Sequence, residues 1–156
     1  MSNLESLAAT SFLLCRGRGR LCALPLDSVV ETMRPLPIEI LPGCPPFVRG
    51  VAVVRGNPTP VVDLGVLLGA ADPPQPVRFV MLNTGGKQVA LSVEAVLGIR
   101  ELTSASLQEL PALLREASVD VVSALGTLDV QLLLVLEAAR MIPPSVWQLL
   151  EAGVSS

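Results

Sequence analysis

The sequence predicts a mainly β protein built from two small β-barrel subdomains, with short helices and a helix at the C-terminal end. Three observations support this fold class. Hydrophobic residues make up 51% of the chain and aromatic residues only 3%, so the core must be aliphatic. Its Val-rich segments favour packed sheets, and they form short runs separated by Gly- or Pro-containing turns. Two segments of the first half also resemble two segments of the second.

In the first half, apolar runs bounded by turn residues predict strands over residues 11–15, 21–24, 48–54 and 59–64. The glycines of the intervening RGRGR segment (16–20) suit a hairpin turn between the first two strands. Asp27 is expected to cap a short helical segment that ends at Met33, and residues 64–68 suit one helical turn.

Proline-containing segments separate these elements. Five prolines between residues 35 and 46 predict an extended connection that lies against the body of the protein. Residues 70–76, with the sequence AADPPQP, are typical of a linker. We place a subdomain boundary there, so that the first subdomain spans about residues 20–70 and the second about 77–136. The strands at the ends of the chain are the candidates for exchange between the two.

The second half is expected to repeat this pattern of strands. Strands are predicted over residues 77–83, 88–93, 98–102, 119–125 and 130–136. A helical turn is predicted over 94–97 and a loop over 103–116. The tail, residues 143–156, contains a predicted helix that begins at Ser145 and ends before Gly153.

An internal repeat links the two halves. Residues 23–30 align with 90–97, since each has a strand end, an acidic residue, a small residue and two aliphatic residues. Residues 60–64 align with 134–138, where an apolar strand again ends in an acidic residue. Two similar five-stranded barrels would explain this pattern, because closure removes exposed sheet edges.

Composition excludes several classes of function. A net charge of −3 argues against a nucleic-acid-binding protein, although Arg16, Arg18 and Arg20 leave that reading as an alternative. The chain contains no His, which removes His-based catalytic triads and the usual ligands of catalytic zinc. No run without charged residues exceeds ten residues, so no transmembrane helix is expected.

The three cysteines are expected to be reduced thiols in a reducing compartment, because their number is odd and no CxxC motif occurs. Cys15 and Cys22 flank the predicted 16–20 turn, so they could lie opposite each other on paired strands.

These features together resemble the CheW-like family, the coupling proteins of bacterial chemosensory arrays. The resemblance covers residues 11–142 as a single CheW-like domain. It rests on motifs in a fixed order: VVE at 29–31, PFVRGV at 46–51 followed by RG at 55–56, PVVDL at 60–64, and LGTLD at 125–129. The resemblance implies two intertwined, five-stranded SH3-like barrels.

The resemblance also implies a non-enzymatic adaptor without a catalytic residue, metal or cofactor. Its partners would be the tip of a methyl-accepting chemoreceptor, the CheW-like regulatory domain of a CheA-type histidine kinase, and other CheW-like proteins. It would act in the cytoplasm at membrane receptor arrays, without inserting into the membrane and without binding nucleic acid. A CheW-like regulatory module of a non-chemotactic two-component system is the alternative.

By the same resemblance, six residues are expected to bind a partner: Val29, Glu31, Gly50, Val51, Arg55 and Gly56. The valines would supply apolar contact to a helical hairpin, and Gly50 would permit close backbone approach. We expect Arg55 to pair with the Glu31 carboxylate; an ordinary surface ion pair is the competing interpretation. An enzyme using Asp63, Glu31 or Ser28 is a further alternative, but Asp63 is better interpreted as a helix cap.

Overall fold

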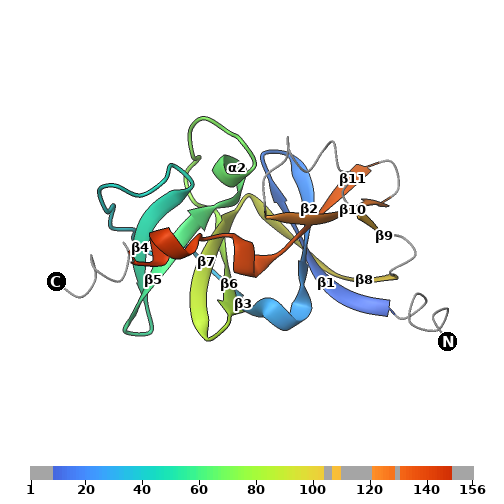
Figure 1. The fold of residues 1–156 in the computed structure, drawn as a ribbon, viewed down its shortest axis with the longest axis horizontal. Helices are drawn as coiled ribbons and strands as arrows, with labels where there is room; N and C mark the ends of the chain where they lie inside the picture. Colours follow the sequence, from blue (N-terminus) through green and yellow to red (C-terminus); the bar gives the residue numbers. More distant parts are fainter. Residues whose placement is uncertain (1–8, 104–106, 110–120, 129–130, 149–156) are drawn as a thin grey trace.

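The computed structural model describes residues 9–103, 107–109, 121–128 and 131–148, which form two β-sheets side by side (Figure 1). The mainly β fold class is therefore confirmed. Sheet A has the strand order β8-β1-β2-β11-β10-β9, and sheet B has the order β3-β6-β7-β5-β4. Sheet B thus has the five strands expected, whereas sheet A gains the short strand β9.

The strands of sheet A are β1 (Ala9–Gly17), β2 (Arg20–Pro25), β8 (Ala95–Thr103), β9 (Leu107–Glu109), β10 (Val122–Leu128) and β11 (Gln131–Leu136). Those of sheet B are β3 (Val29–Met33), β4 (Val48–Val54), β5 (Asn57–Asp63), β6 (Arg78–Thr84) and β7 (Lys87–Val93). Two short helices connect strands, η1 (Leu26–Ser28) and α2 (Leu64–Leu67), and η3 (Ala138–Arg140) follows β11. Every strand expected in the first half, and all five in the second, overlap an observed strand.

Each sheet combines strands from both halves of the chain. The hairpin β1–β2 lies in sheet A with β8 to β11, and the hairpin β6–β7 lies in sheet B with β3 to β5. Parallel pairing of β2 with β11 and of β5 with β7 joins each hairpin to its sheet. The two halves have therefore exchanged their first hairpins.

This exchange corrects the expected subdomain boundary at residues 70–76. That linker connects β5 to β6, and both strands belong to sheet B. The chain instead passes between the sheets at η1 and at Glu94. The composition of the linker identified a loop, but it carried no information about which strands pair on either side.

The internal repeat is visible in the strand register. Val61 pairs with Ala90 in sheet B. Their counterparts in the repeat, Val135 and Ala23, pair with each other in sheet A. The two parallel contacts are thus equivalent, which is what two copies of one structural unit would produce.

Two helical predictions were wrong. Residues 29–33 form β3, and only η1 before them is helical; the Asp27 carboxylate accepts no capping hydrogen bond there. Residues 95–97 likewise begin β8. The β-branched Val29 and Val30 suit a strand, and pairing with β6 outweighs the local helical pattern. The turn predicted at 64–68 matches α2.

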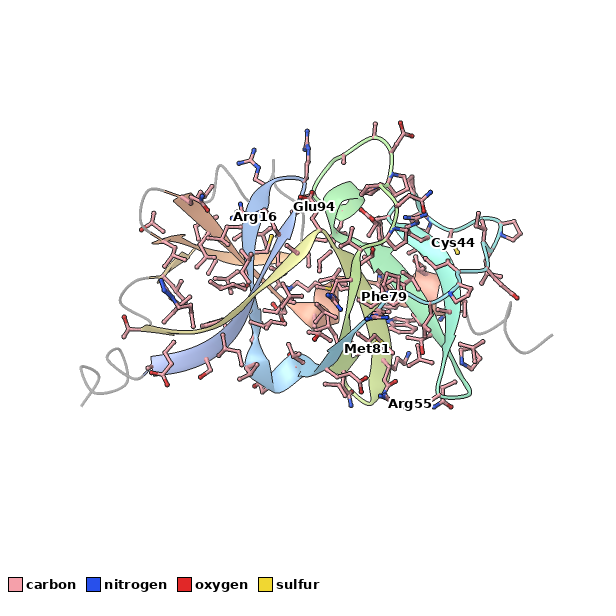
Figure 2. All side chains as sticks on the ribbon, turned by 180° about the vertical axis from the view of Figure 1, so that it is seen from behind. Arg16, Cys44, Arg55, Phe79, Met81 and Glu94 are labelled. Atoms are coloured by element: carbon pink, nitrogen blue, oxygen red, sulfur yellow. The ribbon has the colours of Figure 1, made fainter. Side chains whose placement is uncertain are left out.

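The main hydrophobic core lies between the sheets. It contains buried aliphatic side chains from sheet A, including Leu13 and Leu24, and from sheet B, including Val62 and Leu91. Two smaller clusters lie within the individual sheets. Phe79 and Met81, labelled in Figure 2, belong to the cluster of sheet B. The sheets are therefore held together mainly by aliphatic packing.

The segment after β11 crosses from sheet A to sheet B (Figure 1). Met141, Ile142 and Val146 are buried in the main core. Residues 144–148 are helical, which agrees with the predicted helix as far as Gln148; its remainder lies outside the described residues. The ammonium group of Lys87 lies 4.7 Å from the ring centre of Trp147 and holds this segment on β7. Within the described residues, no helix is long and apolar enough to cross a membrane.

Cys15 and Cys22 pair directly across β1 and β2, as the sequence suggested. Both are free and fully buried, whereas Cys44 is half-buried. Burial raises the pKa of Cys22 to about 12, and burial together with the nearby Cys22 raises the pKa of Cys15 further. Both groups are therefore neutral thiols at physiological pH, and their reactivity should be low.

We predict that Cys44 alone reacts rapidly with a thiol reagent in the native protein at pH 8. A thiol count with 5,5′-dithiobis(2-nitrobenzoate) should show one fast thiol, and all three in denaturant. Two or more fast thiols in the native protein would contradict the burial of Cys15 and Cys22 in the main core.

Candidate partner-binding site

An ion pair joins the two edge strands of sheet B. Glu31 lies on β3 and Arg55 in the turn between β4 and β5. The Arg55 guanidinium donates from Nη1 to Glu31 Oε2 and from Nη2 to Glu31 Oε1, both at 2.6 Å. Because β3 and β4 are at opposite edges of the sheet, this bidentate contact shows that the sheet curls until its edges approach.

The ion pair lies at the surface. The side chains of Arg55 and Glu31 are 66% and 29% exposed. The hydrogen bond from Arg55 lowers the pKa of the Glu31 carboxyl, and the same bond raises the pKa of Arg55. Water and salt screen such a pair, so its contribution to stability is small. Its more evident effect is to hold two charged groups in one geometry at the surface. We call this part of sheet B, formed by β3 and by the turn at Arg55 and Gly56, the rim.

The turn that carries Arg55 has an unusual backbone. Arg55 has φ of 50° and Gly56 of 81°, the pattern of a two-residue hairpin turn. A residue with a side chain rarely adopts positive φ, so Arg55 is held in a strained conformation. No atom lies within 4 Å of a Cβ built on Gly56, which leaves that side of the turn open.

Gly50 and Val51 do not lie at the surface. Glu39, in the proline-rich connection, exchanges two backbone hydrogen bonds of 2.8 Å with Val51. A Cβ on Gly50 would overlap the Glu39 carbonyl oxygen. Gly50 therefore permits a close backbone approach, as expected, but by this chain rather than by a partner. Val51 belongs to the main core.

Aliphatic side chains reach the surface near the edges of both sheets. Val29 is half-buried against the main core, and the neighbouring Val30 is 50% exposed. On β8, Ile99 is 60% exposed. It pairs with Leu13, a residue of the main core, so it lies on the face of sheet A that points toward sheet B. The apolar layer between the sheets thus extends to the surface at both edges.

Sequence reasoning missed Val30, Leu97 and Ile99 as candidate contact residues. Val30 and Leu97 are each left unpaired at a β-bulge, which turns the side chain outward. The internal repeat aligns these two residues with each other. That alignment was the signal that could have identified Val30 and Leu97 as candidate contact residues.

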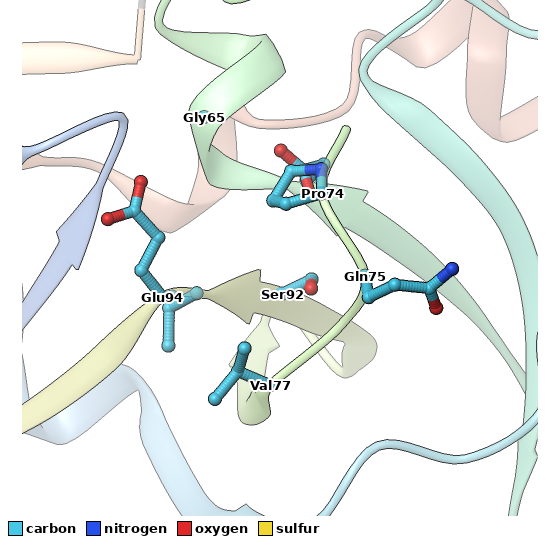
Figure 3. A pocket seen from close by; sticks show the side chains of 8 residues that line it. Gly65, Pro74, Gln75, Val77, Ser92 and Glu94 are labelled. Carbon is cyan, nitrogen blue, oxygen red and sulfur yellow. The ribbon is translucent and has the colours of Figure 1, made fainter. Parts of the chain in front are cut away.

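The acidic residues considered for catalysis do not converge. Asp63 is buried, and its Oδ1 accepts a hydrogen bond of 2.9 Å from the Val66 amide, so it caps α2 as predicted. A cavity beside Asp63 and Ser92 has a volume of about 20 Å³, roughly that needed by one water molecule (Figure 3). Among the described residues, no group of three His, Cys, Asp or Glu side chains could hold a metal.

Comparison with known proteins agrees with this architecture. The model of the CheW-like domain family matches residues 11–144. The chain is also similar to a solved structure, the scaffolding protein TtCheW from Thermoanaerobacter tengcongensis, with a TM-score of 0.76 and 19% sequence identity. The match covers 87% of this chain and 89% of that protein, so the fold is shared over most of both.

We predict that Asp63→Ala lowers the free energy of unfolding by about 1 kcal/mol or more, because α2 loses its cap and a buried polar contact. Asp63→Asn keeps an acceptor and should lose less. Urea denaturation checks both. Unchanged midpoints for Asp63→Ala would show that the cap does not stabilise the fold.

Proposed function

The chain belongs to the CheW-like domain family, and we propose that it is a non-enzymatic adaptor that couples chemoreceptor tips to a CheA-type histidine kinase. The bidentate Arg55–Glu31 pair on the accessible rim of sheet B carries this proposal. It presents a fixed pattern of charge beside exposed aliphatic residues, which suits recognition of another protein rather than conversion of a substrate.

The receptor tip, a helical hairpin in this family, is the proposed partner of this rim. Val29, together with the exposed Val30, would supply apolar contact beside Glu31. The open side of Gly56 would admit the partner's backbone close to Arg55. Gly50 and Val51 would contribute to the rim indirectly, because they hold the proline-rich connection against β4 through Glu39. Ile99 extends the proposed apolar contact onto sheet A.

The regulatory domain of the kinase, which is itself CheW-like in this family, is the second proposed partner, and other CheW-like proteins are further ones. We place this activity in the cytoplasm at membrane receptor arrays, where the tip and the kinase meet. Neither partner contact requires a cofactor or a metal. The chemistry proposed for the protein is therefore binding alone.

A regulatory module of a non-chemotactic two-component system is the second candidate. β5 begins with Asn57 and Pro58, directly after the Arg55–Gly56 turn. Pro58 lacks a backbone N–H and stiffens the strand where family members often carry an aliphatic residue. This difference lies close to the proposed rim, so it favours a receptor or kinase that departs from those of swimming chemotaxis.

We predict that Arg55→Glu weakens capture of a soluble receptor-tip hairpin at least about tenfold, equivalent to about 1.4 kcal/mol, without lowering the melting temperature. The substitution places two carboxylates together on the rim, so the fixed geometry is lost. Titration calorimetry and thermal melting provide the two measurements.

Arg78→Glu is the matched control, since Arg78 is another exposed arginine of sheet B, located on β6. The double variant Glu31→Arg with Arg55→Glu restores an ion pair with the charges exchanged. It therefore tests whether binding depends on the geometry of the ion pair or on direct contact between Arg55 and the receptor. Restored binding would indicate that the pair acts through its geometry, and continued loss that Arg55 contacts the receptor. Equal binding by wild type and Arg55→Glu would refute the proposed role of the rim. A chain that binds a sensor kinase but no chemoreceptor tip would favour the second candidate.

A further inference from the structure

The turn between β1 and β2, residues 17–20, belongs to sheet A but makes non-covalent contacts with elements next to sheet B. Nη1 of Arg18 donates a hydrogen bond of 3.0 Å to the carbonyl oxygen of Leu68, directly after α2. A Cβ on Gly17 would come within 2.5 Å of the Leu64 side chain, so the turn lies tightly on α2. Because α2 follows β5, this contact joins a hairpin of sheet A to an element attached to sheet B.

The same turn also binds Glu94, where the chain passes from sheet B to sheet A. The amide of Gly19 donates to Glu94 Oε1 at 3.2 Å, and the amide of Glu94 donates to the carbonyl oxygen of Arg16 at 2.8 Å. Figure 2 shows Arg16 and Glu94 close together at this end of the molecule. The turn is therefore fixed both to α2, which follows β5 of sheet B, and to Glu94, which directly follows β7 of sheet B.

The second half of the chain provides an internal comparison. By the repeat, the turn between β6 and β7 is equivalent to this one, and it contains Gly85 and Gly86 with φ of 60° and 84°. Arg18 and Gly19 have φ of 53° and 70°, so the two turns share positive φ at both central residues. Glycine adopts positive φ freely, whereas arginine does not. The strained residue in the first turn points to a role for its side chain.

We propose that Arg18 is a positioning residue that fixes the orientation of sheet A relative to sheet B. In Figure 1, α2 and the β1–β2 turn lie at the top of the view, and β3 lies at the bottom. The main core lies between the sheets. A bond that fixes the sheets at one end therefore sets the separation of their edges at the other.

The edges in question are β3, with Val29 and Glu31, and β8, with Ile99. This consequence rests on the proposed function, which assigns these residues to the receptor contact. Without the Arg18 bond, the turn keeps only its packing on Leu64 and its hydrogen bonds with Glu94. The sheets would then shift slightly about the main core, and the two edges would match a rigid helical hairpin less well.

Arg18→Gly tests this proposal, because glycine suits the φ of 53° while the whole side chain, including the guanidinium, is removed. Arg20→Gln is the matched control, since it removes the same charge two residues away. Arg18→Lys retains one donor for the Leu68 carbonyl and tests rescue. Three measurements are made on each full-length variant: the melting temperature, affinity for a soluble receptor-tip hairpin, and backbone amide chemical shifts without any partner.

For Arg18→Gly we expect an affinity loss of at least about fivefold, with a melting temperature close to that of wild type and amide shift changes that extend to β3 and β8. Arg20→Gln should change only shifts near the turn, and Arg18→Lys should recover part of the affinity. Unchanged affinity, an equal effect of Arg20→Gln, or a large fall in melting temperature would overturn the proposal.

The amide shifts test the positioning role of Arg18 independently of the proposed binding to a receptor tip. If the wild type binds no receptor tip, the proposed function fails. Shift changes at β3 and β8 in Arg18→Gly would then still support the positioning role, and changes confined to the turn would overturn it.

Discussion

The reciprocal exchange of two hairpins is the constraint on which the rest of this structure depends. β1–β2 belongs to the first half of the chain but completes sheet A, and β6–β7 belongs to the second half but completes sheet B. Neither half can therefore form its sheet alone. The exchange also places apolar faces of both sheets against each other, which creates the main core and fixes two edge strands, β3 and β8, beside it.

The rim proposed to bind a partner is a consequence of how these edge strands end. An exposed edge strand tends to pair with other chains, and proteins limit this with bulges, prolines and charges. All three occur here: Val30 and Leu97 are at bulges, the proline-rich connection bonds to β4 through Glu39, and Arg55–Glu31 bridges the edges of sheet B. The same features leave aliphatic and charged groups at defined positions. Protection of the edges and the proposed binding of a partner thus involve the same residues.

Much of this arrangement could be predicted from sequence, because strands and turns have local signals. Apolar runs bounded by turn residues identified the strands, and Asp63 was recognised as a cap from its place before α2. Strand exchange has no local signal, so the boundary was assigned to the linker at 70–76. The pattern at 27–33 was read as helical because pairing of β3 with β6 cannot be seen locally. The Arg55–Glu31 pair was expected from family resemblance, whereas burial of Gly50 depends on Glu39, which no motif indicated.

We propose that a rim on sheet B, and not a catalytic cleft, is responsible for the function of this protein. Hydrogen–deuterium exchange of the full chain, alone and with a soluble receptor-tip hairpin, tests it most directly. We predict slower exchange in β3 and in the turn at Arg55 and Gly56 when the receptor tip is bound. Unchanged exchange in both segments, with protection confined to β9, β10 or the far ends of sheet A, would contradict it.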